Sequence, residues 1–85
     1  MKVKVLFFAS LREQLGIARE ELEVPKEINS LEKLKAHLRS RGGAFEKAFS
    51  GKALVRGAVN QEMVQPGAPI KAGDEVAFFP PVTGG

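Results

Sequence analysis

One segment of the sequence has a clear helical pattern, whereas most other segments have the patterns of strands. In NSLEKLKAHLRSRGG, residues 29–43, Leu31, Leu34 and Leu38 recur at the spacing of one helix face, after two candidate capping residues and before two glycines. A single helix covers only one face of a sheet, and 85 residues form one small domain with a thin core. The sequence therefore predicts an α+β domain whose sheet has one helix-covered face and one open face.

Strand patterns account for most of the remaining chain. They cover residues 2–9, 19–24, 53–60, 62–64 and 75–79. Between the first two strands, SLREQLG has Ser10 and Glu13 at the spacing of a capping box and Gly16 as a stop, which predicts a short helix. AFEKAFSGK, residues 44–52, is compatible with a helical turn or a loop. Together these elements predict a mixed sheet of four or five strands packed on one main helix.

Apolar side chains are predicted on the open face at three strands. Because side chains alternate along a strand, Phe8 shares a face with the two lysines of KVKVLFF, which need water. In the same way Phe79 shares a face with Glu75, and Met63 shares a face with two glutamines. Single exposed apolar residues are common, but a contiguous patch on so small a domain is typical of a partner-binding surface. We therefore predict that Phe8, Met63 and Phe79 are exposed and bind a partner.

The sequence after the last strand suits insertion into another protein. This tail consists of Pro80, Pro81, Val82, Thr83, Gly84 and Gly85. The two prolines keep the chain extended and cannot continue a strand ladder, and the two glycines, which lack side chains, fit a narrow channel. The alternative is a terminus that merely frays. We predict a domain over residues 1–79 and a flexible tail over residues 80–85.

The reactive group of the tail is the α-carboxylate of Gly85. A carboxylate becomes electrophilic when ATP converts it to an acyl adenylate, and a sulfur nucleophile then gives a thiocarboxylate. The chain has no cysteine to capture its own activated carbonyl. Gly51-Lys52 resembles the end of a phosphate-binding loop, but Glu46 and Ala53 stand where glycine and Ser or Thr are required. We therefore expect this chain to bind no cofactor itself and a partner to bind the ATP.

The composition argues against several other functions. Without cysteine and with His37 as the single histidine, the sequence offers no disulfide and no Cys or His metal cluster, so we expect no metal site. The apolar stretches are too short for a membrane span or a signal peptide, which predicts a cytoplasmic protein without a membrane partner. The net charge of +3 is mild and neither Tyr nor Trp is available for base stacking, so we expect no nucleic-acid partner.

Three segments resemble the sulfur-carrier small subunits of molybdopterin synthase, a ubiquitin-like family. They are KVLFFASLRE near the N-terminus, AVNQ in the middle and GDEVAFFPPVTGG at the end. The resemblance implies a ubiquitin-like β-grasp fold. It also implies that an E1-like adenylyltransferase uses ATP and Mg²⁺ to adenylate Gly85, and that a sulfurtransferase or cysteine desulfurase supplies the sulfur of the thiocarboxylate.

The resemblance further implies the partner that consumes this sulfur. In the family the small subunit is non-catalytic, and its tail enters the large subunit and donates sulfur to cyclic pyranopterin monophosphate, building the dithiolene. The complex is a heterotetramer of two small and two large subunits. The family's interface positions fall on Phe8, Met63 and Phe79, and Arg12 in the matched SLRE segment is a further candidate contact. We expect no activity from such a chain alone.

Three other functions remain open from the sequence. A carrier for thiamine-thiazole synthesis shares the fold and the Gly-Gly end, although it is usually shorter and lacks FFPPVTGG. A ubiquitin-like protein modifier joins its last glycine to a lysine of a target through an isopeptide bond. A plain interaction module carries a chemically inert end.

Overall fold

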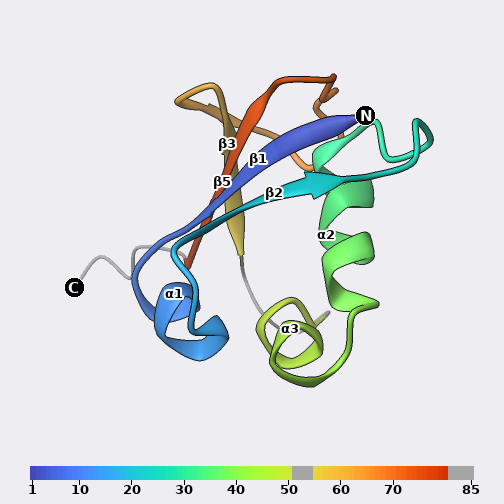
Figure 1. Ribbon diagram of the computed structural model, residues 1–85. Coiled ribbons are helices and arrows are strands. Elements are labelled where there is room, and N and C mark those ends of the chain that lie inside the picture. The colour runs from blue at the N-terminus through green and yellow to red at the C-terminus, as the bar shows by residue number, and fades with distance from the viewer. Residues whose placement is uncertain (51–54, 81–85) are drawn as a thin grey trace.

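A five-stranded mixed sheet forms the centre of the molecule, in the order β2-β1-β5-β3-β4 (Figure 1). The computed structural model describes residues 1–50 and 55–80. The strands are β1 (Lys2–Phe7), β2 (Arg19–Glu23), β3 (Arg56–Val59), β4 (Glu62–Val64) and β5 (Glu75–Phe79). β1 and β5 run parallel, and the other neighbouring pairs are antiparallel. The first and last strands therefore terminate at the same end of the sheet.

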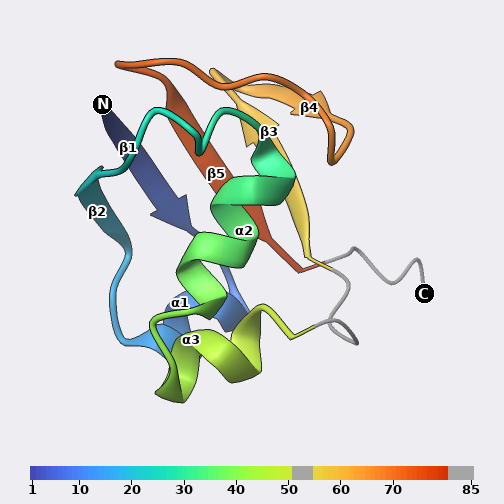
Figure 2. The same ribbon diagram turned by 90° about the vertical axis from the view of Figure 1, so that its right-hand side faces the viewer.

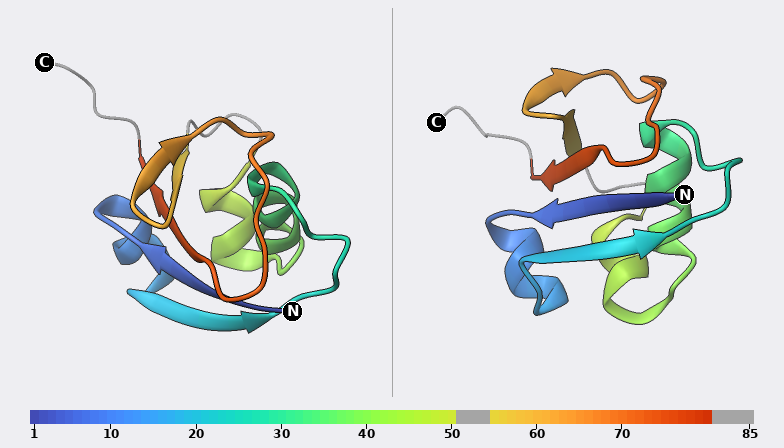
Figure 3. Two further views of the ribbon diagram at one scale, coloured as in Figure 1. Left: turned by 90° about the horizontal axis from the view of Figure 1, so that it is seen from above. Right: turned by 45° about the horizontal axis from the view of Figure 1, so that its top comes forward.

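The helices of the described residues leave one face of this sheet uncovered. They are α1 (Ser10–Leu15), α2 (Leu31–Arg39) and α3 (Gly43–Ala48). α2 lies across one face, and α3 lies next to α1 beyond one end of the sheet (Figures 1 and 2). No helix in the described part of the chain lies over the opposite face, as the two views of Figure 3 show. The prediction of one covered and one open face is confirmed.

The core lies between α2 and the covered face. α2 buries Leu31, Leu34 and Leu38, as their spacing predicts. The two central strands bury alternate residues, which are Val3, Val5, Phe7, Val76 and Phe78. The Phe78 ring packs edge-to-face on Phe49, with centroids 5.2 Å apart. AFEKAFSGK, which the sequence left undecided, thus contributes helix α3 and a buried phenylalanine directly after it.

Two predictions of helix ends were wrong. Ser10 does not cap α1: it is the first helical residue, Ala9 takes the cap position, and no side chain caps the helix. Ser30 does cap α2, because its Oγ accepts a hydrogen bond from the Lys33 N–H at 3.2 Å. However, α2 ends at Arg39 rather than at the glycine pair, since Gly42 takes a positive φ of 76° and becomes the cap position of α3.

A buried carboxylate fixes the start of β5. Asp74 is only 6% exposed, and it accepts hydrogen bonds from Asn60 Nδ2 at 3.1 Å and from the Lys71 N–H at 2.9 Å. Asn60 Oδ1 in turn accepts from the Glu75 N–H at 3.1 Å. Asn60 and Gln61 form the turn between β3 and β4, both with positive φ. The matched segments AVNQ and GDEVAFF therefore meet in space and hold β5 in register with its neighbours.

The arrangement is the predicted ubiquitin-like β-grasp. Part of the strand predicted at residues 53–60 lies outside the described residues, and the described part is β3. The division into a domain over 1–79 and a tail over 80–85 stays a prediction, because residues 81–85 also lie outside them. Among the described residues, no helix has the length and apolar character needed to cross a bilayer.

Candidate functional site

An apolar row crosses the open face of the sheet. The register pairs Leu6 with Ala77, Ala77 with Ala58, and Ala58 with Met63. Paired residues on neighbouring strands project from the same face, so the row runs over β1, β5, β3 and β4. Its two central members are alanines, which leave little side-chain bulk in the middle of the face.

Two phenylalanines lie beside this row, at the end of the sheet where β1 and β5 terminate. Phe7 pairs with Phe78, and Phe8 and Phe79 are the next residues on their strands. The Phe8 N–H donates to the Phe78 carbonyl at 3.1 Å, which extends the ladder one residue beyond β1. The side chains of Phe8 and Met63 are 47% and 59% exposed. The prediction that both are exposed on the uncovered face is confirmed.

Phe79 is less exposed than its alternation alone predicted. Its side chain is half-buried rather than free in solvent. The reason is the strand order: β5 is the middle strand, with β1 on one side and β3 on the other, and Phe79 pairs directly with Arg56. Phe8 follows the end of its strand and Met63 lies on the edge strand β4, so both have fewer neighbours. Phe79 therefore lies on the predicted face, but as a half-buried residue.

Two arginines border the apolar row, and the sequence reasoning missed both. Arg19 pairs with Leu6 from β2, and Arg56 pairs with Phe79 from β3. Both are exposed. The same alternation that placed Met63 could have placed them once the strand pairing was known. Arg12, the arginine that the sequence did single out, is exposed on α1 and not on the sheet itself.

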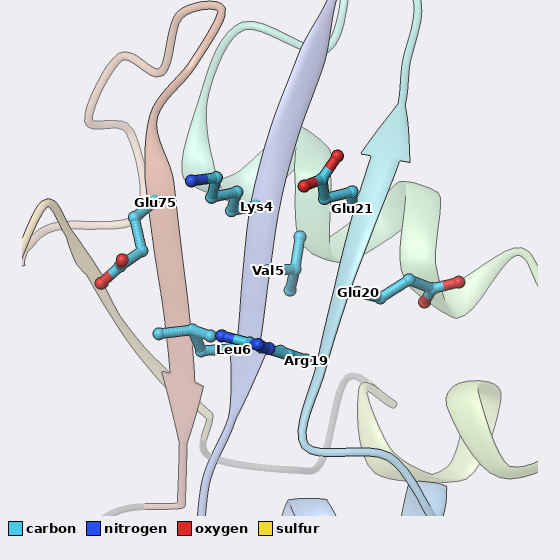
Figure 4. A pocket seen from close by; sticks show the side chains of 7 residues that line it. All are labelled: Lys4, Val5, Leu6, Arg19, Glu20, Glu21 and Glu75. Atoms are coloured by element: carbon cyan, nitrogen blue, oxygen red, sulfur yellow. The ribbon is translucent and has the colours of Figure 1, made fainter.

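The other half of the open face is charged. Lys4 on β1 pairs with Glu21 on β2 and with Glu75 on β5, and Figure 4 shows the three side chains next to one another. They border an open pocket of about 420 Å³. Its lining residues are Lys4, Val5, Leu6, Arg19, Glu20, Glu21 and Glu75. Lys4, Glu21 and Glu75 form no ion pair with another described residue. These charges are therefore available to a partner that covers the face.

The described residues do not assemble a group of three or more His, Cys, Asp or Glu side chains that could hold a metal ion. These residues do form a surface on the open face. It is apolar at the end of the sheet where β5 ends and charged at the end where β5 begins. Such a surface is suited to docking. Pro80, half-buried, is the last described residue after β5. The predicted site residues from Pro81 to Gly85 lie outside the described part of the chain.

A protein-family model matches nearly the whole chain. The model described as the ThiS family matches residues 5–85, which include the whole apolar row, Phe8, Phe79 and the tail. The chain belongs to the ThiS family. It is 44% identical over 84 residues to the molybdopterin synthase sulfur carrier subunit of Escherichia coli strain K12, covering 98% of this chain and 99% of the relative. It is 42% identical, with the same coverage, to the subunit of that name from Haemophilus influenzae.

Solved structures resemble this ThiS-family chain over nearly its full length. A putative molybdopterin converting factor subunit 1 from Pyrococcus furiosus is 33% identical with a TM-score of 0.77, covering 96% of this chain and 99% of that one. SAMP1 from Haloferax volcanii is 27% identical with a TM-score of 0.79 and full coverage of both chains. A chain from the complex of subunits 1 and 2 of the molybdopterin-converting factor of Helicobacter pylori is 26% identical with a TM-score of 0.66, again with full coverage.

Proposed function

We propose that this chain is the sulfur carrier subunit of a molybdopterin synthase. The observation that carries the proposal is the full-length similarity, 44% identity over 98% of the chain, to a protein of that name. The geometry supports it, because the apolar part of the open face lies at the end of the sheet where β5 leads into the tail. The body of the protein docks through this face, and the tail carries the chemistry.

In this proposal the reacting atom is the carbonyl carbon of Gly85. A carboxylate oxygen of Gly85 attacks the α-phosphate of ATP on an E1-like adenylyltransferase, and pyrophosphate leaves. The terminal sulfur of a persulfide on a sulfurtransferase or cysteine desulfurase then displaces AMP and forms an acyl disulfide. A thiol of the sulfur donor attacks the S–S bond, which releases the thiocarboxylate and leaves a disulfide on the donor. Mg²⁺ and ATP belong to the adenylyltransferase, and this chain binds no cofactor of its own. Since loading consumes ATP, the proposal also places the carrier in the cytoplasm.

The loaded carrier then docks on the large subunit. Phe8, Met63 and Phe79 supply the apolar contact, and Arg12 is a candidate contact to a carboxylate of the partner. The tail from Pro80 to Gly85 enters the large subunit, where the thiocarboxylate transfers sulfur to cyclic pyranopterin monophosphate. We propose a heterotetramer of two small and two large subunits, in which the small subunit has no activity alone. The Helicobacter pylori structure, a complex of subunits 1 and 2, supports this kind of partner.

A protein modifier is the second candidate, because the chain also resembles SAMP1, which a second Haloferax volcanii structure describes as small archaeal modifier protein 1. In that case Gly85 forms an isopeptide bond with a lysine instead of a thiocarboxylate. A carrier for thiazole synthesis shares the loading chemistry but delivers sulfur to a different acceptor. These alternatives differ in the product formed at Gly85 or in the acceptor that takes the sulfur.

Intact-mass measurement separates a sulfur carrier from a modifier and from an inert module, and product formation with the large subunit and the pterin precursor separates the two kinds of carrier. The chain is incubated with its adenylyltransferase, ATP and a sulfur source. The proposal predicts a mass gain equal to the exchange of one oxygen for sulfur, located at Gly85. A modifier gives high-mass adducts in cell extract that disappear when Gly85 is deleted, and an inert module gives neither product.

Changing the length of the tail provides a second test. Deleting Gly85, or adding one residue after it, should abolish sulfur transfer, because the reacting carbonyl no longer reaches its position. Both variants should unfold like the original chain, since the change is confined to the last residue, a glycine without a side chain to pack in a core. Normal sulfur transfer from the extended chain would argue strongly against insertion of the tail.

A further inference from the structure

The turn that follows β1 contains an unusual backbone conformation. The Leu11 N–H donates to the Phe8 carbonyl at 3.2 Å and closes a four-residue turn. Its second residue, Ala9, has φ 53° and ψ −130°. This is close to the second position of a type II′ turn, where glycine is preferred. A residue with a Cβ pays a steric penalty there, so the conformation persists only if the surrounding structure imposes it.

No other described residue with a positive φ has a plain aliphatic side chain. The remaining ones are Gly16, Gly42, Gly43, Gly73, Asn60 and Gln61. Four of these are glycines, which take such φ values without strain. Asn60 and Gln61 form the turn between β3 and β4, a position that favours positive φ in hairpins. Ala9 is neither a glycine nor part of a hairpin turn, so neither of these reasons explains its positive φ.

Two buried anchors and one hydrogen bond impose the conformation. Phe7 and Leu11 are 1% and 2% exposed, so both ends of the segment are fixed in the core. The Phe8 N–H is held by the Phe78 carbonyl. Only three residues connect the anchors, and Ala9 is the middle one. The chain must therefore turn sharply at Ala9 to bury Leu11 while Phe8 stays in register with β5.

The consequence is the position of Phe8. Strand alternation directs the Phe8 ring to the open face, where it is 47% exposed beside the end of β5, and the turn at Ala9 holds the residue in that register one position beyond β1. We propose that Ala9 is a positioning residue, whose restricted backbone holds Phe8 on the open face as a pre-organised contact for the large subunit. Glycine would relieve the strain but would also free the segment, and the partner would then have to immobilise Phe8 on binding. This inference rests on the proposed function of the open face.

Three versions of the full chain test the inference: the natural chain, Ala9→Gly, and a synthetic chain with D-alanine at position 9. D-alanine favours the observed φ without strain and restricts the backbone. We expect both variants to melt at a higher temperature than the natural chain. We expect Ala9→Gly to bind the purified large subunit roughly two- to tenfold more weakly, the cost of immobilising one side chain. The D-alanine chain should bind at least as tightly as the natural chain.

Hydrogen exchange of the free chain provides a readout that does not need the partner. The Phe8 amide should exchange faster in Ala9→Gly and no faster in the D-alanine chain. Ala36→Gly is the matched control, because Ala36 is exposed in the middle of α2. There glycine should lower the melting temperature and leave the affinity unchanged.

Equal affinity of the natural and Ala9→Gly chains, or a lower melting temperature of the D-alanine chain, overturns the positioning role of Ala9. If the natural chain itself does not bind the large subunit, the proposed function of the open face fails, and the inference fails with it. The two failures are therefore distinguishable.

Discussion

The two faces of the sheet are built from the same strands but serve different purposes. Phe78 and Phe79 are adjacent and chemically identical, yet Phe78 is fully buried on the covered face and Phe79 is half-buried on the open face. The covered face holds the fold together, and the open face presents apolar side chains that the fold leaves partly exposed. Residue type alone does not separate the two roles, whereas position in the strand alternation does.

The covered face should dominate stability. Phe78→Ala removes a ring that contacts Phe7 and Phe49 and should lower the free energy of unfolding by about 3–5 kcal/mol. Denaturant titration measures this value directly. A loss below about 1 kcal/mol would mean that the core is not organised around this ring.

The open face should dominate recognition. Phe79→Asp should weaken binding to the large subunit by about 2 kcal/mol or more, as expected for an aromatic residue at the centre of an interface. Because Phe79 is half-buried, we expect a stability loss of about 1 kcal/mol, well below that of Phe78→Ala. Calorimetric titration of the folded variant checks the binding. The contrast between the faces breaks down if Phe79→Asp unfolds the protein.

The polar network at the start of β5 should affect both faces through stability alone. Asp74→Ala leaves Asn60 Nδ2 and the Lys71 N–H without their acceptor and should cost about 1–3 kcal/mol of unfolding free energy. Glu75→Ala is the control, because only the backbone of Glu75 takes part in the network, and it should change stability by less than about 0.5 kcal/mol. Equal effects of the two substitutions would assign no special role to the network.

The smallest effect is expected at the charged margin of the open face. Arg56→Gln should leave stability within about 0.5 kcal/mol and should slow association with the large subunit a few-fold at low salt. Arg39→Gln, an exposed arginine on α2, should have no such effect. Stopped-flow association at two salt concentrations compares them. If both variants associate like the natural chain, the margin plays no part in steering the partner.

Much of this architecture was predictable because it depends on local patterns. The period of the leucines identified α2, and alternation within β1, β4 and β5 placed Phe8, Met63 and Phe79 on the correct face. The half-burial of Phe79 was not predictable in this way, because it depends on which strands lie on either side of β5.

Other features were missed because they join residues far apart in the sequence or contradict local preference. The hydrogen bond between Asn60 and Asp74 spans 14 residues and forms only once β3 and β5 are paired. The positive φ at Ala9 has no sequence signal, since alanine ordinarily avoids it, and it arises from the burial of Phe7 and Leu11 on either side.

The most direct test of the whole account follows labelled sulfur from the carrier to the pterin. The chain is loaded with labelled sulfur at Gly85 and mixed with the large subunit and cyclic pyranopterin monophosphate. The account predicts that the label moves to the dithiolene product and that the carrier returns to its carboxylate form. Retention of the label on a carrier that is bound to the large subunit would contradict it.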